Sequence, residues 1–137
     1  MRSDYEEIQN LLAKYCFLTD RGTAEEIASL FWDDAVMHFG ENENRGVEKI
    51  TLGLQRWIEK MRDPVVGLRH ILHLPHIEIN GNDATSEAYY DADGHSKNKG
   101  KLIQLRGVYR DQFTKRDGVW RFQRRETQIW RSLLDHA

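Results

Sequence analysis

The amino-acid sequence predicts an α+β fold in which three helices precede a meander of long strands. Apolar residues recur at helical spacing over roughly the first sixty residues, and alternating segments bounded by turn residues follow them. The chain has 137 residues, of which 39% are hydrophobic and 31% charged, and no linker or low-complexity segment divides it. We therefore expect one domain over residues 1–137.

The predicted helices are residues 4–19, residues 23–32 and residues 47–62. Thr23 and Glu26 have the spacing of a capping box, in which each side chain accepts a hydrogen bond from the other residue's backbone N–H, and this pair marks the start of the second helix. Leu12, Cys16 and Asp20 form an i, i+4 row beside the apolar stripe of the first helix. Asp20 is therefore expected on a buried edge rather than on the polar face.

The predicted strands are a short one at residues 35–39 and long ones at residues 67–79, 84–92, 101–115 and 119–130, with polar loops at residues 40–44 and 93–100. Asn80-Gly81 and Asp117-Gly118 are hairpin turn signals between neighbouring long strands. Long antiparallel strands twist and curve, so that three helices can close over one face of the sheet. This arrangement predicts a cone with an internal pocket of the kind that binds small molecules.

The composition argues against several classes of function. A formal net charge of −2 disfavours a nucleic-acid surface. No apolar run approaches the roughly 20 residues of a membrane helix, and the first residues lead into an amphipathic helix without the pattern of a secretory signal. A single cysteine, Cys16, forms no internal disulfide, which fits a reducing compartment. We expect a cytoplasmic protein that binds neither nucleic acid nor membrane.

Several local features of the sequence, taken in order, resemble those of a known family. They are Ile8-Gln9 in the first helix, Asp20 after it, Trp32-Asp33-Asp34-Ala35, Gly46 before the third helix, His70 on its strand, and Arg116-Asp117-Gly118-Val119-Trp120 at the last turn. Together their order and spacing resemble the SnoaL-like branch of the NTF2-like superfamily, most closely the scytalone dehydratase and hexachlorocyclohexane dehydrochlorinase group. The resemblance implies an NTF2-like cone, with a curved, mainly antiparallel sheet and three helices enclosing a pocket.

The same resemblance implies a set of site residues. In that group an Asp–His pair is the catalytic dyad, and the residues at the matching places are Asp20 and His70. Substrate contacts are implied at Tyr15, Arg125 and Tyr109. Dehydrochlorinases carry a lysine at the place of Tyr15, whereas related bile-acid dehydratases carry a tyrosine. Tyr15 therefore favours dehydration over dehalogenation.

The chemistry of these residue types agrees with that assignment. A carboxylate that holds one imidazole nitrogen fixes the tautomer and stabilises the imidazolium, so that the other nitrogen can remove a proton near neutral pH. Tyr15 could donate a hydrogen bond to a departing hydroxyl or an enolate oxygen, and Arg125 could hold an anionic group. Structural roles stay open beside these: Asp20 as a helix-end residue, His70 as a packed strand residue and Tyr15 as a core aromatic.

The sequence thus predicts an enzyme, a cofactor-independent lyase that carries out a dehydratase-like elimination on a small cyclic or polyketide-like compound. Two alternatives remain. One is an isomerase or polyketide cyclase that uses the same dyad. The other is a non-catalytic subunit like the small subunits of ring-hydroxylating dioxygenases, which share the fold. We expect a homo-oligomer, a trimer or a dimer, with no cofactor and no metal.

Strand periodicity raises one question about side-chain direction. If Arg125 faces the pocket, Trp120 and Phe122 face outward, where a sister subunit would have to cover them, unless a β-bulge intervenes. If Arg125 faces solvent, Arg124 takes its place; we favour Arg125.

Three histidines share the strand at residues 67–79, but alternation places His73 opposite to His70 and His76. A metal site there is disfavoured, and neither His38, His95 nor His136 has a spacing that completes one. Asp91 and Asp93 lie where related dehydratases place another acidic residue, and we expect solvated loop positions for both.

Overall fold

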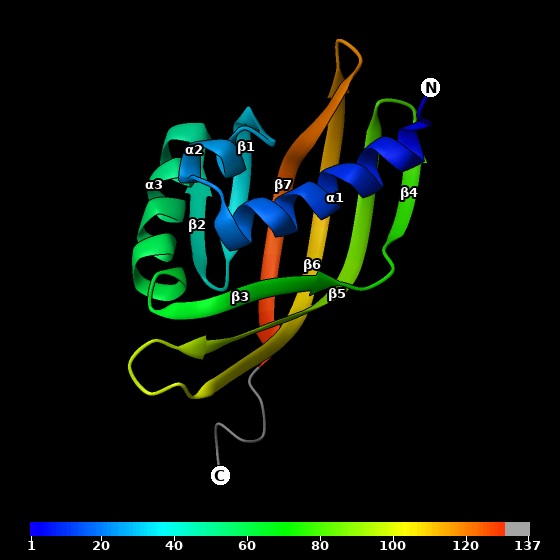
Figure 1. Ribbon diagram of the computed structural model, residues 1–137. Helices are drawn as coiled ribbons and strands as arrows, with labels where there is room; N and C mark the ends of the chain where they lie inside the picture. Colours follow the sequence, from blue (N-terminus) through cyan, green and yellow to red (C-terminus); the bar gives the residue numbers. More distant parts are fainter. Residues whose placement is uncertain (131–137) are drawn as a thin grey trace.

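Three helices pack against a curved, open sheet of seven strands in the computed structural model, which describes residues 1–130 (Figure 1). The helices are α1 (Asp4–Arg21), α2 (Ala24–Ala28) and α3 (Val47–Trp57), and α3 continues into one π-helical turn, η1 (Ile58–Arg62). The strands are β1 (Phe31–Phe39), β2 (Asn42–Arg45), β3 (Val65–Leu72), β4 (His76–Asn80), β5 (Asp83–Ser96), β6 (Leu102–Arg116) and β7 (Val119–Trp130). The predicted α+β order is confirmed. Of the histidines considered as metal ligands, His136 lies outside the described residues.

The sheet has the order β2-β1-β7-β6-β5-β3, and β4 pairs with the remaining length of β5 beyond β3. All strand pairs are antiparallel except β1 with β7, which is parallel. Helix α1 crosses one face of the sheet, whereas α2 and α3 lie beside β1 and β2 (Figure 1). The buried apolar core fills the space between these helices and the sheet. Among residues 1–130, no helix is long and apolar enough to cross a membrane.

Local sequence signals set several of the element ends. The capping box of Thr23 and Glu26 is present, with the Glu26 N–H donating to the Thr23 hydroxyl at 3.1 Å. Ser3 and Glu6 form a second capping box at the start of α1. The hairpin turn between β4 and β5 contains Gly81 with φ of 63°, a left-handed conformation that costs glycine little.

The second helix is shorter than predicted. It ends at Ala28, and the apolar residues Phe31 and Trp32 belong to β1, because pairing with β7 satisfies the backbone of this segment. Residues 42–44, expected in a polar loop, form with Arg45 the edge strand β2 against β1. Their side chains are largely exposed, so the alternation that identifies a buried strand is missing from the sequence.

The predicted strand at residues 67–79 is two strands. The chain leaves the sheet after Leu72 and re-enters it at His76, and Pro75, which has no backbone N–H to donate, lies in the break. The partner strand β5 is longer than predicted and runs to Ser96. Asp91 and Asp93 are therefore strand residues opposite β3 rather than loop residues.

A β-bulge in β7 resolves the direction of Arg125. The register between β6 and β7 shifts because Gln123 has no partner between Phe122 and Arg124. This extra residue allows Trp120, Phe122 and Arg125 all to point into the core, where all three are buried. The two aromatic side chains therefore need no sister subunit to cover them.

Arg125 forms a buried ion pair with Asp111. Its Nε lies 3.0 Å from Asp111 Oδ1, and neither side chain has accessible surface. The guanidinium also lies over the rings of Tyr109 and Tyr15, with its Cζ 3.6 Å and 4.0 Å from their centroids. Burial raises the pKa of Asp111 to about 6, while the Arg125 charge opposes this shift. The guanidinium therefore favours the ionised form of the Asp111 carboxyl against the effect of burial, and each group is the counter-ion of the other.

We predict that Asp111→Ala destabilises the fold by about 3–5 kcal/mol, because it leaves a guanidinium buried without its counter-ion. Urea unfolding followed by circular dichroism measures the change. Glu87→Ala is the matched control, since Glu87 on β5 pairs with Arg110 on the exposed face of β6, and its loss should cost less than about 1 kcal/mol. Equal effects of the two substitutions would contradict the assignment.

Candidate functional site

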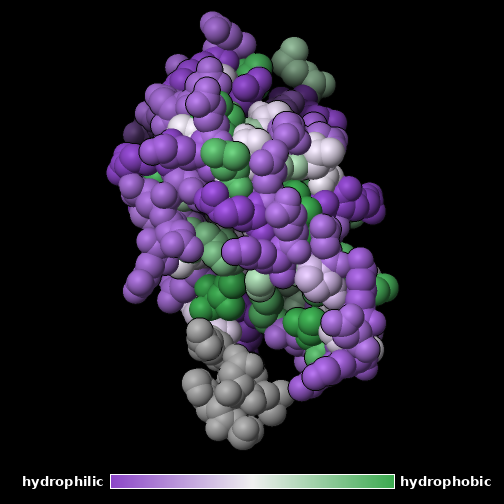
Figure 2. Space-filling view, turned by 90° about the vertical axis from the view of Figure 1, so that its left-hand side faces the viewer, coloured by the Kyte–Doolittle hydropathy of each residue, from purple (hydrophilic) through white to green (hydrophobic). Residues whose placement is uncertain are grey.

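A cavity of about 660 Å³ lies between the helices and the sheet. Its wall includes Tyr15 and Thr19 from α1, Leu54 and Trp57 from α3, Leu68 and His70 from β3, and Tyr90, Tyr109 and Thr127 from β5, β6 and β7. Figure 2 shows the side of the molecule on which α3 lies, where hydrophobic surface gathers in the lower half among hydrophilic residues. A largely apolar cavity with a few polar groups is typical of a small-molecule site.

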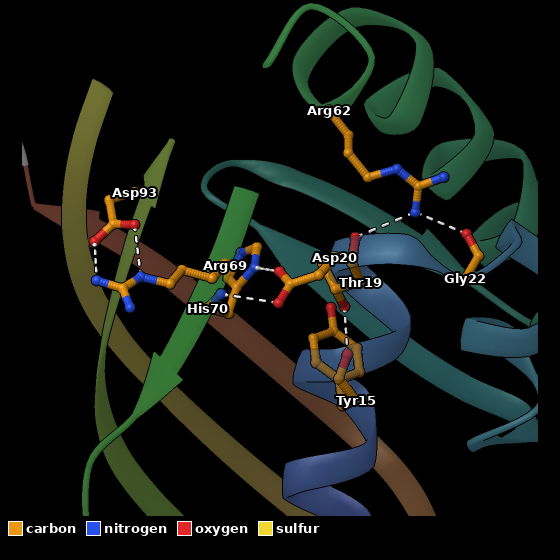
Figure 3. A network of polar contacts seen from close by, with 8 residues as sticks. All are labelled: Tyr15, Thr19, Asp20, Gly22, Arg62, Arg69, His70 and Asp93. Carbon is orange, nitrogen blue, oxygen red and sulfur yellow. Dashed lines mark hydrogen bonds and ion pairs between the residues drawn. The ribbon is translucent and has the colours of Figure 1, made fainter. Parts of the chain in front are cut away.

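Asp20 and His70 meet at the edge of this cavity. Asp20 Oδ1 lies 2.6 Å from His70 Nδ1, and Asp20 Oδ2 accepts the backbone N–H of His70 at 3.1 Å (Figure 3). The side chains are 11% and 8% exposed. Because a carboxylate only accepts hydrogen bonds, the short contact requires a proton on Nδ1, and in the neutral imidazole this leaves the Nε2 lone pair free. This is the arrangement of an oriented general base.

Two neighbours fix the plane of the His70 ring. The imidazole stacks on Tyr90 with ring centroids 6.1 Å apart, and Trp57 lies at 6.1 Å in a tilted arrangement. His70 lines the cavity, whereas Asp20, which contacts the Nδ1 edge of the His70 ring, does not. No hydrogen bond joins Nε2 to any of the residues 1–130. The nitrogen that Asp20 does not occupy is therefore available to a ligand.

Arg62 holds the end of α1, which carries Asp20. Its guanidinium donates to the carbonyl oxygens of Thr19 at 3.2 Å and Gly22 at 2.7 Å (Figure 3). The last carbonyls of a helix have no partner within the helix, so an arginine is well suited to them. Arg62 was not predicted from the sequence, because its partners lie about forty residues upstream and no local pattern connects them. The π-helical turn η1 is the element that presents it.

Three tyrosines form one side of the cavity. Tyr90 and Tyr109 stack with ring centroids 4.1 Å apart, and Tyr15 meets Tyr109 edge-on at 6.0 Å. Burial raises the pKa of each of the three phenols. All three therefore stay protonated and can donate hydrogen bonds to a ligand oxygen. Tyr90 was not among the predicted site residues. The available signal was its spacing of two residues from Ala88 and Ala92, which puts all three on the inward face of β5.

The predicted substrate-contact residues take different places. Tyr15 and Tyr109 line the cavity, but Arg125 lies behind them, with its guanidinium over both rings. Its Nη1 and Nη2 have no hydrogen-bond partner within residues 1–130. Arg124, the alternative candidate, is half-buried, and its Nη2 lies 3.9 Å from Glu126 Oε2. The structure thus gives Arg125 contact with the two tyrosines rather than a place on the cavity wall.

A second Asp–His pair lies outside the cavity. His73 Nε2 is 2.6 Å from Asp91 Oδ2, and these side chains are 51% and 47% exposed. His73 lines an open groove between α1 and the β3–β4 connection, which His70 also touches. Asp93 lines the cavity and accepts two hydrogen bonds from Arg69. Within residues 1–130, no group of three or more His, Cys, Asp or Glu side chains is placed to hold a metal ion.

We predict that Asp20→Asn switches the His70 tautomer, because the new amide can donate to Nδ1 and so favours the proton on Nε2. Long-range ¹H–¹⁵N NMR of the neutral imidazole reports which nitrogen carries the proton. The control is Asp91→Asn, which should change the His73 signals and leave those of His70 in place. An unchanged His70 spectrum in Asp20→Asn would contradict this geometry.

Comparisons with known proteins agree with this architecture. A family model described as SnoaL-like domain matches residues 1–126. A comparison with curated protein sequences gave no match. Three solved structures are similar to the chain over most of its length: a protein of unknown function from Mycobacterium tuberculosis (25% identity, 94% of this chain and 73% of that chain, TM-score 0.79), an NTF2-like protein with a cystatin-like fold from Novosphingobium aromaticivorans (24%, 90% and 80%, 0.79), and the hexachlorocyclohexane dehydrochlorinase LinA, type 2 (21%, 90% and 82%, 0.73). These similarities confirm the NTF2-like fold predicted from the sequence.

Proposed function

The chain belongs to the SnoaL-like domain family, and from this premise we propose that it is a cofactor-independent lyase that removes water from a small cyclic or polyketide-like hydroxy compound. The observation that carries the proposal is the Asp20–His70 pair, in which a carboxylate holds Nδ1 and the ring lines a largely apolar cavity. A carboxylate-held imidazole is the usual form of a general base in proteins, and general-base help of this kind is worth roughly 10²–10⁴ in rate.

The proposed reaction balances without a second reactant. His70 Nε2 takes a proton from a carbon next to a carbonyl group. The carbon–hydrogen electron pair forms a double bond to the carbon on the other side, whose bond to its hydroxyl oxygen breaks. The imidazolium then gives its proton to the departing hydroxyl, which leaves as water and restores the neutral imidazole. Asp20 stabilises the imidazolium between these two steps.

The tyrosines support the same reaction. A substrate carbonyl oxygen gains negative charge when the adjacent carbon loses its proton, and protonated phenols are hydrogen-bond donors that stabilise such charge. Tyr15, Tyr90 and Tyr109 all line the cavity that His70 lines. We propose Tyr15 and Tyr109 as substrate contacts, and Arg125 as the positive charge behind them that assists the developing oxyanion from a distance. Fold neighbour LinA is by name a dehydrochlorinase, an enzyme of the elimination class.

An isomerase or cyclase is the second candidate. The three phenols favour it, since a well-stabilised enolate can return its proton to another carbon or attack one instead of expelling hydroxide. Mass spectrometry of the product separates the two classes, because dehydration makes it lighter by one water and isomerisation leaves its mass unchanged. A non-catalytic subunit would need neither the free Nε2 nor the cavity beside it.

We predict that His70→Gln and Asp20→Asn each lower turnover of an identified substrate by at least about a hundredfold, because each removes the oriented base. Steady-state kinetics measures the loss, with circular dichroism to show that the fold is kept. His73→Gln and Asp91→Asn are the matched controls, since they break a pair with the same 2.6 Å distance on the outer surface. If turnover survives both dyad substitutions within a factor of a few, the dyad has no catalytic role.

We further propose that the protein is a homo-oligomer, a dimer or trimer of this chain. Tyr89 and Trp130 are exposed on the outer side of the sheet, where their rings lie 5.4 Å apart and offer an aromatic surface to a second copy. Size-exclusion chromatography with light scattering at micromolar concentration should give the mass of two or three chains. A monomer under these conditions would contradict the prediction.

A further inference from the structure

One corner of the cavity is rich in hydrogen-bond donors that the proposed mechanism does not use. Arg56 and Lys60, four residues apart on α3 and η1, line the cavity, and so do Asn42 and Asn44 on β2. The two walls meet closely here, because a Cβ built on Gly53 would lie 2.7 Å from Asn44 Nδ2. Gly53, Arg56 and Lys60 recur at i, i+3 and i+7, so the two cations follow the helix face that Gly53 sets against β2, and we call this part of the wall the corner between α3 and β2.

The charges in this corner do not cancel. The cavity wall also contains Glu43 and Asp93, but both carboxylates are occupied. Glu43 accepts from Arg45 Nε at 2.6 Å, and Asp93 accepts from Arg69 Nε at 2.8 Å, so each is neutralised by an arginine. His38 Nε2 also lies 2.9 Å from Glu43 Oε1.

Arg56 and Lys60, by contrast, form no ion pair or hydrogen bond with any side chain in the described part of the molecule. The uncompensated charge on this part of the cavity wall is therefore positive.

A separate observation indicates that the cavity receives a polar ligand. Thr127 lines it from β7, opposite Phe39 of β1, and is only 4% exposed. Its Oγ1 has no hydrogen-bond partner within residues 1–130. A buried hydroxyl without a partner costs free energy, which a ligand oxygen or amide can recover. Thr127 and the donor-rich corner thus point to a ligand with oxygen acceptors.

We propose that the molecule bound in this cavity is an organic carboxylate, with its charged group at Arg56 and Lys60 and its apolar body along the wall beside His70. Helix α3 connects the corner to the dyad in space, because the ring of Trp57, the residue after Arg56, has its centroid 6.1 Å from that of His70. That this carboxylate is the substrate rests on the proposed function. The anion subsite itself rests on charge and geometry alone.

A matched pair of probes tests the subsite without turnover. Isothermal titration calorimetry compares 1-naphthoate with the neutral 1-naphthamide, which differ in charge and little in shape. We expect the acid to bind about tenfold more tightly at low salt and to lose this preference as salt is added, because Arg56 and Lys60 are exposed and salt screens their charges. Arg56→Gln combined with Lys60→Gln should abolish the preference and leave amide binding unchanged.

Lys14→Gln combined with Lys49→Gln is the control, since it removes the same charge from exposed positions outside the cavity. A preference that survives the Arg56/Lys60 double substitution, equal binding of acid and amide to the wild type, or no binding of either probe at millimolar concentration overturns the proposal. Repeating the titration with His70→Gln separates the two ideas. The acid preference should persist in His70→Gln, because His70 is not part of the subsite. If it persists and His70→Gln also leaves turnover of an identified substrate unchanged, the subsite stands and the elimination is rejected.

Discussion

The contact between Asp20 and His70 is the interaction on which the site depends. One carboxylate accepts both the backbone N–H and the Nδ1–H of the same residue, so it fixes the position of β3 and the orientation of the ring together. The two residues are fifty positions apart, and their meeting requires α1 to end above β3. Arg62 secures that end by binding the carbonyl oxygens of Thr19 and Gly22. The hydrogen bonds that hold β3 against the end of α1 therefore also orient the His70 ring.

A second constraint acts from behind the cavity. The bulge at Gln123 turns Arg125 inward, where Asp111 balances its charge and the rings of Tyr15 and Tyr109 cover it. Burial raises the pKa of these phenols and the guanidinium lowers it, with burial the larger effect. The phenols thus stay protonated while a positive charge lies directly behind them. Such a wall favours negative charge on an oxygen that it binds, at the cost of a buried ion pair.

The sequence predicted what local chemistry determines. The capping box of Thr23 and Glu26 and the hairpin turn at Gly81 depend on residues a few positions apart, and both were found. The edge strand β2 and the bulge at Gln123 depend on partner strands, and no local pattern reveals them. The pairing of Asp20 with His70 came from a resemblance rather than from spacing, and Arg62, whose partners are equally distant in the chain, had no such guide.

Two Asp–His pairs in one chain show why distance alone does not identify a base. Both pairs have a 2.6 Å contact, but His73 and Asp91 are about half exposed, where water and salt screen the interaction and compete for each hydrogen bond. The pair at His70 is nearly enclosed, with Tyr90 stacked on the ring and the cavity beside it. In the elimination that we propose, a proton taken there from a bound molecule would meet little bulk water, so the imidazolium could return it to the same molecule. Enclosure by α1, α3 and the curved sheet, rather than the residue types, separates the two pairs.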